Sequence, residues 1–241
     1  MARMSKADES IAARPFPKHL QLTFIVYKAA ESSRTGEIRH QLDISGTRYT
    51  LKSERQTARL ASLRNAGRII QTSSGKIGEH GLQPDTYEEE EITRNGKQSF
   101  QVTFDWAAQK LRYSDGSATP LPADAQDNLS FMYHISRHPL NREFLAMPVS
   151  DGAQLQQYQI EIGTKEHLAT PLGELRVLHL REMHAPGATY FEIWLGLQYR
   201  LLPVKFRLVD SSGKVIEEFV ISDIRAGDKY LPGERNPVTV C

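Results

Sequence analysis

Cysteine is almost missing from this sequence of 241 residues, because Cys241 is the only one and the last residue of the chain. A single cysteine cannot form an intramolecular disulfide, so no disulfide framework holds the fold together. Zinc sites built from several cysteines are excluded for the same reason. The terminal position also makes Cys241 a poor candidate for a catalytic nucleophile.

Long apolar stretches are missing as well. No run approaches the roughly 20 apolar residues that a transmembrane helix needs, so we expect no membrane span. The first residues, Met1 to Glu9, contain no apolar segment of the kind found in a signal peptide. Two possibilities therefore stay open: a cytoplasmic protein, or an exported or anchored one whose export signal or anchor has been removed.

The sequence also lacks an excess of positive charge. Lysine and arginine number 30, aspartate and glutamate 29, and the net charge is +1 with neutral histidines. Domains that bind nucleic acid usually carry a basic excess or stripe, so nucleic acid is not an expected partner. The longest charge run is acidic, Glu88 to Glu91, near Arg94 and Lys97. It predicts a solvated strand or hairpin face or, alternatively, a patch for a cation or a basic partner.

Alternation of apolar and polar residues dominates the sequence and predicts antiparallel strands with one buried face. Ser45-Gly46 and Asn95-Gly96 stand where two such segments meet, which predicts hairpins. A further strand pair is predicted over 68–79, with its turn at Ser74-Gly75. The other predicted strands lie within 20–27, 37–44, 47–52, 87–94, 97–105, 111–114, 157–162, 173–182, 189–195, 201–209 and 214–224.

Between residues 127 and 138 the apolar period becomes that of a helix, with Met132 and Tyr133 on one face. Asp127 is placed to cap this helix and Pro139 to end it. We therefore predict about 10 to 12 strands and one main helix. Strand twist accumulates and exposed edges promote aggregation, so a sheet this long should curl. The expected fold is mostly β: a curved antiparallel sheet, open or closed like a barrel, with the helix packed against it.

The predicted strands form one domain, because all-β domains often reach this length and no boundary is visible. Residues 1–17 are polar and predict a disordered lead-in. The single β-rich domain is expected over 18–226. The tail, 227–241, is rich in glycine, proline and charge and is expected to be irregular.

No recognisable motif for catalysis or cofactor binding is present. Ser74-Gly75-Lys76 lacks the flanking residues that a phosphate loop needs. His134 and His138 are four residues apart, but the glutamate of the zinc-protease pattern is missing, so we interpret them as a pair on the helix surface. Ser130, His134 and Asp127 could form a nucleophilic set, although capping explains Asp127 and Ser130 better. We expect no enzymatic activity, no cofactor and no metal.

Aromatic residues are the remaining candidates for a binding site. Both faces of the predicted strand 189–195 carry apolar groups. This pattern indicates either a sheet that is packed on one side and lines a ligand cavity on the other, or a plain two-sided core. If a cavity exists, the candidate ligand-binding residues are Trp106, Met132, Tyr133, Tyr190 and Trp194.

Four segments, in this order, resemble a known family: Thr103 to Trp106, Ala125 to Phe131, Ile193 to Leu195 and Leu202 to Arg207. The family is a bacterial cell-envelope family catalogued as domain of unknown function 3108, and the resemblance covers about residues 18–224. It implies an exported, β-rich protein in the periplasm or envelope, and the family has no established activity. The expected fold is also broadly similar to lipocalins and the periplasmic lipoprotein carrier, which is an analogy of fold alone.

Three functions remain open at this point. The leading hypothesis is a non-enzymatic envelope protein that binds a lipid or another apolar or amphipathic ligand inside the curved sheet, with the helix over 127–138 as a lid. The second is a structural or interaction module of envelope assembly that binds a partner protein through an edge strand or the hairpin at 88–97. The third is a hydrolase without a recognisable motif.

Overall fold

The computed structural model describes residues 15–28, 33–57, 67–78, 81–93, 96–138, 140 and 142–227. Strands dominate these residues, and helices are short. The strands are β1 (His19–Lys28), β2 (Ser33–Ser45), β3 (Arg48–Thr57), β4 (Arg68–Gly78), β5 (Gly81–Thr93), β6 (Gly96–Asp105), β7 (Lys110–Tyr113), β8 (Ala118–Pro120), β9 (Gln126–Asp127), β10 (Phe144–Ser150), β11 (Leu155–Thr170), β12 (Gly173–Glu182), β13 (Tyr190–Gly196), β14 (Leu202–Val209) and β15 (Val215–Gly227). The helical elements are α2 (Phe131–His134) and the 3₁₀ turns η1 (Ile135–Arg137) and η2 (Leu197–Tyr199).

All fifteen strands belong to one sheet, in the order β8-β7-β6-β5-β4-β3-β2-β1-β15-β14-β13-β12-β11-β10-β9. Each neighbouring pair is antiparallel except β9 and β10, which run parallel. The first and last strands, β1 and β15, pair at the middle of the sheet. The sheet therefore has a first half, β1 to β8, and a second half, β9 to β15, that meet along this central pair.

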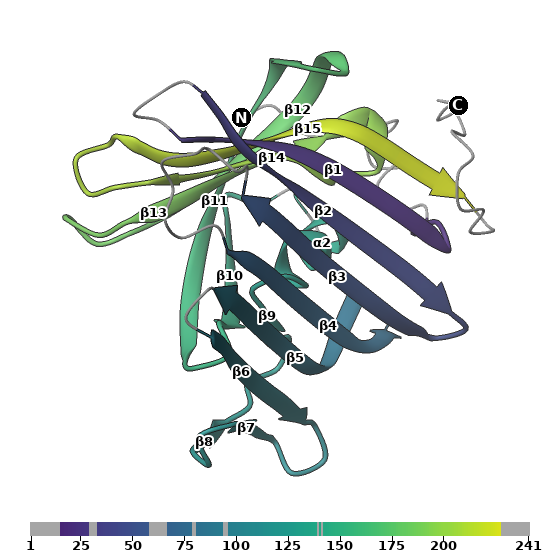
Figure 1. Cartoon of the computed structure of the whole chain (residues 1–241), viewed down its shortest axis with the longest axis vertical. Coiled ribbons are helices and arrows are strands. Elements are labelled where there is room, and N and C mark those ends of the chain that lie inside the picture. Colours follow the sequence, from purple (N-terminus) through teal and green to yellow (C-terminus); the bar gives the residue numbers. More distant parts are fainter. Residues whose placement is uncertain are drawn as a thin grey trace.

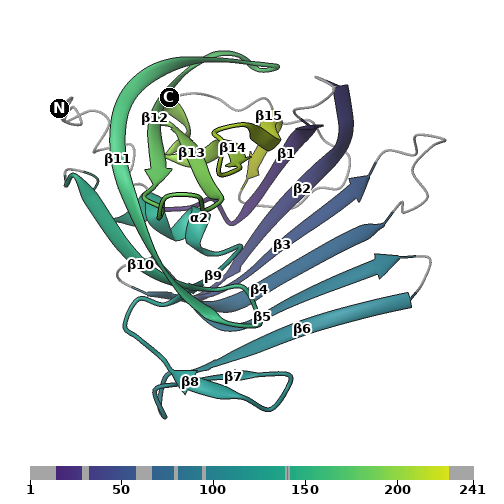
Figure 2. The same cartoon turned by 90° about the vertical axis from the view of Figure 1, so that its left-hand side faces the viewer.

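The sheet curls around α2, as Figures 1 and 2 show from two directions. At the far edge, β9 contacts β5, and the Gln126 side chain donates a hydrogen bond of 2.9 Å to the carbonyl oxygen of Leu82. Among the described residues no ladder joins the two edges in the strand order, so the barrel-like curl stays unclosed. The predicted curved antiparallel sheet with a helix packed against it is confirmed.

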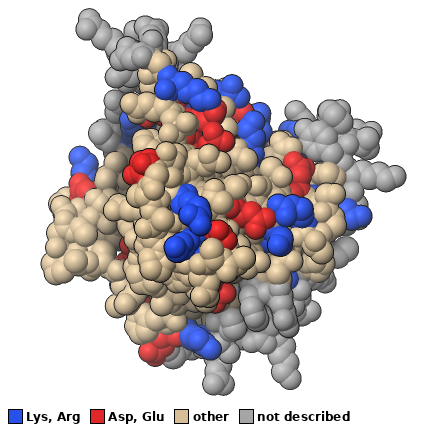
Figure 3. Space-filling model, turned by 90° about the horizontal axis from the view of Figure 1, so that it is seen from below, with Lys and Arg blue, Asp and Glu red and all other residues tan. Residues whose placement is uncertain are grey.

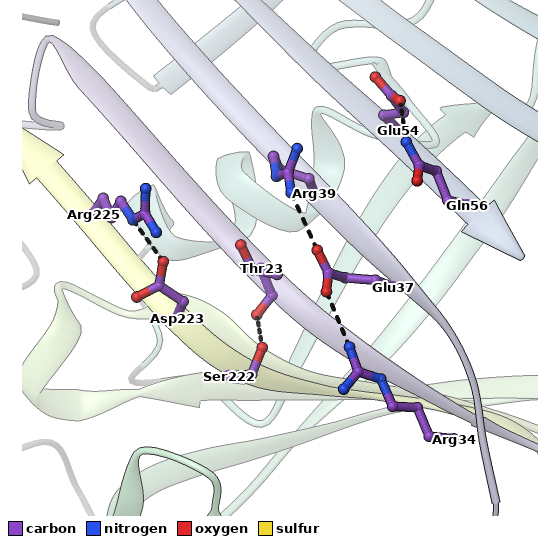
Figure 4. A network of polar contacts seen from close by, with 9 residues as sticks. All are labelled: Thr23, Arg34, Glu37, Arg39, Glu54, Gln56, Ser222, Asp223 and Arg225. Carbon is purple, nitrogen blue, oxygen red and sulfur yellow. Dashed lines mark hydrogen bonds and ion pairs between the residues drawn. The ribbon is translucent and has the colours of Figure 1, made fainter. Parts of the chain in front are cut away.

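Alternation along the strands separates a packed inner face from a wet outer face. In β1, Leu22 and Phe24 are buried on the inner face. On the outer face of β2, Glu37 accepts hydrogen bonds from the exposed side chains of Arg34 (3.1 Å) and Arg39 (3.2 Å), a network drawn in Figure 4. The period-two pattern in the sequence thus assigns the faces of these strands correctly.

Two hydrophobic clusters fill the curl. The first is formed mainly by inner side chains of β1 to β7 and by the segment 121–133 that crosses them. The second joins Phe131, Ile135 and Leu140 to side chains of β10 to β13. The helical segment lies between the clusters and contributes side chains to both, so it connects the two halves of the sheet.

Gly75 lies within a strand, which corrects the predicted turn at Ser74-Gly75. The strand β4 runs through this position and pairs with β5, whose register shifts there. A Cβ atom on Gly75 would lie only 2.1 Å from the carbonyl oxygen of Gln83 in β5. The glycine marks a close backbone approach at a β-bulge, a role that sequence cannot distinguish from a turn. The total of fifteen strands also exceeds the prediction, because β8, β9 and β10 were not predicted. β8 and β9 are too short to show alternation, and β10 ends in four consecutive buried residues.

The helix is shorter than predicted and starts later. Asp127 lies in β9, and Ser130 occupies the N-cap position without a capping side-chain hydrogen bond. The Asp127 carboxylate instead accepts hydrogen bonds from the backbone N–H groups of Leu129 (2.9 Å) and Ser130 (2.7 Å). It therefore holds the turn that leads into the helix. Pro139, predicted to end the helix, lies outside the described residues.

The ends of the chain are described only in part. Phe16, within the predicted lead-in, packs against the first cluster and lies 5.4 Å below the guanidinium carbon of Arg137. Residues 1–14, the predicted turn residue Asn95 and the tail from 228 lie outside the described part of the chain. Among the described residues, no helix has the length and apolarity needed to cross a bilayer.

Candidate binding cavity

A cavity of about 340 Å³ lies inside the curl, between the inner face of the sheet and α2. Its volume falls near the lower end of the range of about 300–1,000 Å³ that is typical of small-molecule sites. Both halves of the sheet contribute to it. The lining residues are Phe24, Ile38, His40, Ser53, Arg55, Ile69, Gln71, Glu89, Asn128, Phe131, Met132, Tyr158, Phe191, Pro203, Phe206, Leu208 and Phe219.

The second half and α2 together supply an aromatic wall, formed by Phe131 of α2 and by Tyr158, Phe191, Phe206 and Phe219. Phe191, Phe206 and Phe219 stack in sequence, with ring centroids 5.8 and 5.6 Å apart. Phe131 and Tyr158 meet Phe191 edge-on at 5.5 and 5.0 Å. Both arrangements suit the aromatic quadrupole, so the rings hold one another in place. The wall is a continuous apolar surface that is already organised.

The first half supplies a polar row, formed by His40, Ser53, Gln71 and Glu89. These residues stand directly opposite one another across β2, β3, β4 and β5, because His40 pairs with Ser53, Ser53 with Gln71 and Gln71 with Glu89. Side chains at directly paired positions point to the same face of a sheet. One line of register therefore brings four polar groups to the cavity.

Hydrogen bonds fix the orientation at the Glu89 end of the polar row. The Gln71 amide nitrogen donates to Glu89 Oε2 (2.8 Å) and to the hydroxyl of Tyr87 (3.1 Å). The Tyr87 hydroxyl donates to the same Glu89 oxygen (2.9 Å). Burial, followed by the charge of Glu89, raises the pKa of Tyr87 far above its usual range, so this phenol stays a hydrogen-bond donor.

The other end of the polar row is a neutral histidine. His40 Nδ1 lies 2.9 Å from the hydroxyl of Tyr133, which reaches it from α2. Burial lowers the pKa of His40 to about 4, because the imidazolium form would lose its hydration. At neutral pH the ring is uncharged, and it contacts the ring of Phe24 at 5.1 Å between centroids.

Arg55 is the one arginine or lysine among the lining residues in the described part of the chain, and a carboxylate engages it. Its guanidinium makes two hydrogen bonds to Glu217 in β15, one of 3.0 Å from Nη1 and a shorter one from Nη2. The Arg55 guanidinium carbon also lies 5.8 Å from the ring centroid of Phe219. This bidentate pair joins β3 to β15 and neutralises the arginine locally.

A second polar network is buried outside the cavity lining. The Tyr49 hydroxyl lies 2.9 Å from Ser73 Oγ, and Ser73 donates to Asp127 Oδ2 at 2.6 Å. Burial raises the pKa of Asp127, although several hydrogen bonds to the carboxylate oppose that shift. The network ties β3 and β4 to β9. Both Asp127 oxygens accept hydrogen bonds within it, so its role is structural.

The residues considered for nucleophilic chemistry do not form a triad. Ser130 Oγ accepts a hydrogen bond from the backbone N–H of Asp127 (3.1 Å), while His134 Nε2 lies 2.7 Å from His138 Nε2. His134 is buried, which corrects the interpretation of the two histidines as a surface pair. Within the described residues, no group of three or more potential metal-ligating side chains comes together.

Of the residues predicted from sequence to bind a ligand, Met132 is the one that lines the cavity. Tyr133 is fully buried and approaches the cavity through His40. Trp106 lies outside the lining, where its indole N–H donates to the carbonyl oxygen of Pro84 (2.7 Å).

Tyr190 and Trp194 also lie outside the lining, because both occupy the face of β13 opposite to Phe191. Tyr190 stacks on His184 at 4.1 Å between centroids. The ring centroid of Trp194 lies 4.8 Å from Nζ of Lys205 and 5.0 Å from the guanidinium carbon of Arg207. Ligand binding by these aromatic side chains stays a prediction.

The sequence analysis did not predict that the aromatic wall and the polar row form one site. Alternation shows that Phe206 and Phe219 each point to one face of a strand, but it does not show which strands pair or in which register. The acidic run contains a further signal. Glu89 lines the cavity, whereas its neighbour Glu90 pairs with Lys97 on the other face of the hairpin. The run is therefore a two-sided strand and not a single charged patch.

Charges of both signs are interspersed on the surface. Figure 3 shows lysine and arginine side chains next to aspartate and glutamate side chains over one face of the molecule. Charged residues on neighbouring strands also pair, such as Arg181 with Glu161 at 2.8 Å. The face shown presents no broad field of one sign, unlike the surface expected of a nucleic-acid-binding protein.

Comparison with known sequences gives a match over most of the chain. The sequence profile of a family described as "Protein of unknown function (DUF3108)" matches residues 23–219. No curated protein matches the sequence significantly. The match spans β1 to β15 and includes every strand that lines the cavity.

Solved structures similar to this one include a β-barrel-like protein of domain of unknown function DUF1849 from Brucella abortus. It has a TM-score of 0.57 and 8% identity, over 89% of this chain and 100% of that chain. A proposed exported protein with a YmcC-like fold from Bacteroides fragilis has a TM-score of 0.36 and 11% identity, over 88% of this chain and 97% of that chain. A proposed lipoprotein from Parabacteroides distasonis has a TM-score of 0.35 and 10% identity, over 87% of this chain and 97% of that chain. At these identities the first of them supports the barrel-like fold and nothing further.

Proposed function

This chain belongs to the DUF3108 family of proteins of unknown function, and we propose that it is a non-enzymatic protein that binds a small apolar or amphipathic ligand in the cavity. The observation that carries this proposal is the contrast between the aromatic wall and the polar row on opposite sides of one cavity. Apolar surface removed from water contributes about 25 cal/mol per Å². The aromatic wall would supply affinity, and the polar row would orient the ligand.

Preorganisation of the walls supports the proposal. The rings of Phe191, Phe206 and Phe219 are already stacked, and Gln71 and Glu89 are already hydrogen-bonded. A ligand would not have to order these side chains, which removes an entropic cost that otherwise weakens binding.

The chemistry of the lining favours binding over catalysis. A general base needs a free acceptor near the reacting group and a pKa near the working pH. His40 has a pKa of about 4 and is hydrogen-bonded to Tyr133. Arg55 is held by Glu217. We therefore propose binding without turnover, at the periplasm or envelope location that the resemblance of the sequence implies.

Binding to a partner protein is the second candidate function. Ile92 and Phe100 are 36% and 42% exposed on the hairpin of β5 and β6, the hairpin singled out from the acidic run. The two side chains lie on opposite faces of this hairpin, so a partner that covers both would wrap around it. Replacing both by serine would abolish a pull-down from envelope extracts if this candidate is right, and would leave small-molecule binding intact.

The cavity proposal can be tested by filling the cavity. Leu208→Trp places a larger side chain into the lining, and Ile216→Trp on β15 makes a comparable change at an exposed position. We expect Leu208→Trp to weaken binding of the neutral apolar dye N-phenyl-1-naphthylamine at least about tenfold, equivalent to about 1.4 kcal/mol. Ile216→Trp should bind like the wild type.

Fluorescence titration measures both dissociation constants, and circular dichroism checks that both variants fold. Native mass spectrometry of the protein purified from its host would add the mass of any retained ligand. Equal dye binding by the two variants, or none by the wild type, would contradict the proposal.

A further inference from the structure

The charges that line the cavity do not cancel. Four lining residues can ionise: His40, Arg55, Glu89 and Tyr158. Tyr158 is neutral at pH 7, because burial raises its pKa to about 12. His40 is neutral at pH 7, and the positive charge of Arg55 is engaged by Glu217. Glu89 therefore remains as a net negative charge at the cavity.

The partners of Glu89 are neutral groups. Gln71 and Tyr87 both donate to its Oε2 oxygen, which stabilises the carboxylate without neutralising it. Its other oxygen, Oε1, accepts no hydrogen bond from the described residues. No lysine or arginine in that part of the chain pairs with Glu89, although Lys97 pairs with the adjacent Glu90. Glu89 thus keeps both its charge and a free acceptor.

The aromatic wall adds to this polarity. The faces of aromatic rings carry negative electrostatic potential and attract cations. Burial raises the pKa of Tyr158 to about 12, and the negative charges of Glu182 and Asp151 add to this shift. A second anion in the cavity would face repulsion that partial burial strengthens. A cation would be attracted both by the aromatic wall and by Glu89 in the polar row.

We propose that the cavity selects an amphiphile with a single chain and an ammonium head group, with Glu89 as its ion-pair partner. The volume of about 340 Å³ fits one small ligand and leaves no room for a lipid with two chains. The ammonium donates to Glu89, and the chain lies along the aromatic wall. This inference rests on the function proposed above and adds the chemical class of the ligand.

The test compares three ligands with the same 12-carbon chain: dodecylammonium, dodecanoate and the uncharged dodecyl maltoside. Each competes with N-phenyl-1-naphthylamine below its micelle concentration, at pH 7 and about 150 mM salt, where long-range surface attraction is screened. We expect wild-type protein to bind dodecylammonium at least tenfold more tightly than dodecanoate.

Two matched variants assign the selectivity to one carboxylate. Glu89→Gln keeps an acceptor for Gln71 and Tyr87 and removes the charge, so the preference for dodecylammonium should fall about tenfold. Glu90→Gln, on the other face of the same strand, should keep the preference. The comparison of dodecylammonium with dodecanoate on wild-type protein tests the proposal even if Glu89→Gln does not fold.

The outcomes separate the two proposals. If no ligand competes with the dye and the dye itself does not bind, the cavity is not a binding site. If the ligands bind but dodecanoate binds as tightly as dodecylammonium, the inference on the head group is wrong and the binding function stands. An unchanged preference in Glu89→Gln would also overturn the role of this carboxylate.

Discussion

The two halves of the curled sheet fill their shared interior by different physical means. The first half places polar side chains in register and holds them by hydrogen bonds, both within the polar row, as between Gln71 and Glu89, and to α2, as between His40 and Tyr133. The second half packs aromatic rings against one another and needs no outside partner. Polar burial is costly unless every group is paired, whereas aromatic burial tolerates small misfits. The first half should therefore be more sensitive to single substitutions.

The largest effect is expected at Asp127, which joins the first half to β9. Asp127→Ala removes the acceptor for the Ser73 hydroxyl and for the N–H groups of Leu129 and Ser130. Breaking such a buried network should lower the free energy of unfolding by about 3–5 kcal/mol. Urea denaturation at pH 7 measures the change. Asp127→Asn, which keeps one acceptor oxygen, should cost less than half as much, and equal costs would argue against the hydrogen-bond account.

A pH-dependent effect is expected at His40. Its pKa is about 4 in the folded protein and about 6.5 when unfolded, so the unfolded state binds the proton first as pH falls. The stability from the neutral ring is complete above pH 6.5 and is lost between pH 6.5 and 4, by about 3 kcal/mol in total.

The variant His40→Gln should lack this loss, and its unfolding free energy should change less between pH 7 and 4.5 than that of the wild type. His167→Gln on the exposed hairpin of β11 and β12 is the matched control and should follow the wild type. Parallel urea curves for His40→Gln and wild type across this range would contradict the assignment.

The smallest effect compares one bulge glycine from each half. A Cβ on Gly75 would lie 2.1 Å from the carbonyl oxygen of Gln83, whereas a Cβ on Gly163 in β11 would lie 2.9 Å from that of His179. Gly75→Ala should cost about 1–3 kcal/mol because backbone must move, and Gly163→Ala should cost less. Thermal and urea unfolding measure both, and a reversed order would show that the second half is the less tolerant one.

The part of the fold that depends on the alternation of apolar and polar residues was predictable from sequence. Alternation in strands such as Leu20 to Val26 follows from one buried face, and it predicts a curved antiparallel sheet without further information. Gly75 was misread, because a glycine that admits a neighbouring backbone looks the same in sequence as a glycine in a turn. The helix was drawn too long, because Asp127 serves a turn before Phe131 and not the helix itself.

The site was much less predictable than the fold. His40, Ser53, Gln71 and Glu89 come together through the register of four strands, and register depends on hairpin geometry and on the bulge opposite Gly75. Trp106 and Trp194 attracted attention by residue type, yet both use their indole groups in contacts outside the lining. Phe206 and Phe219 looked like ordinary strand residues and form the centre of the aromatic wall.

The central pairing of β1 with β15 has a consequence for biogenesis. Ribosomes deliver a chain from its N-terminus, and the strands β1 to β8 can zip up as successive hairpins while synthesis continues. The hydrogen-bonding edge of β1, however, has no partner until residues 215–227 emerge. A nascent or truncated chain thus exposes an adhesive edge in the middle of the future sheet. Holding this chain unfolded until release, by a chaperone or during translocation, would protect it from aggregation.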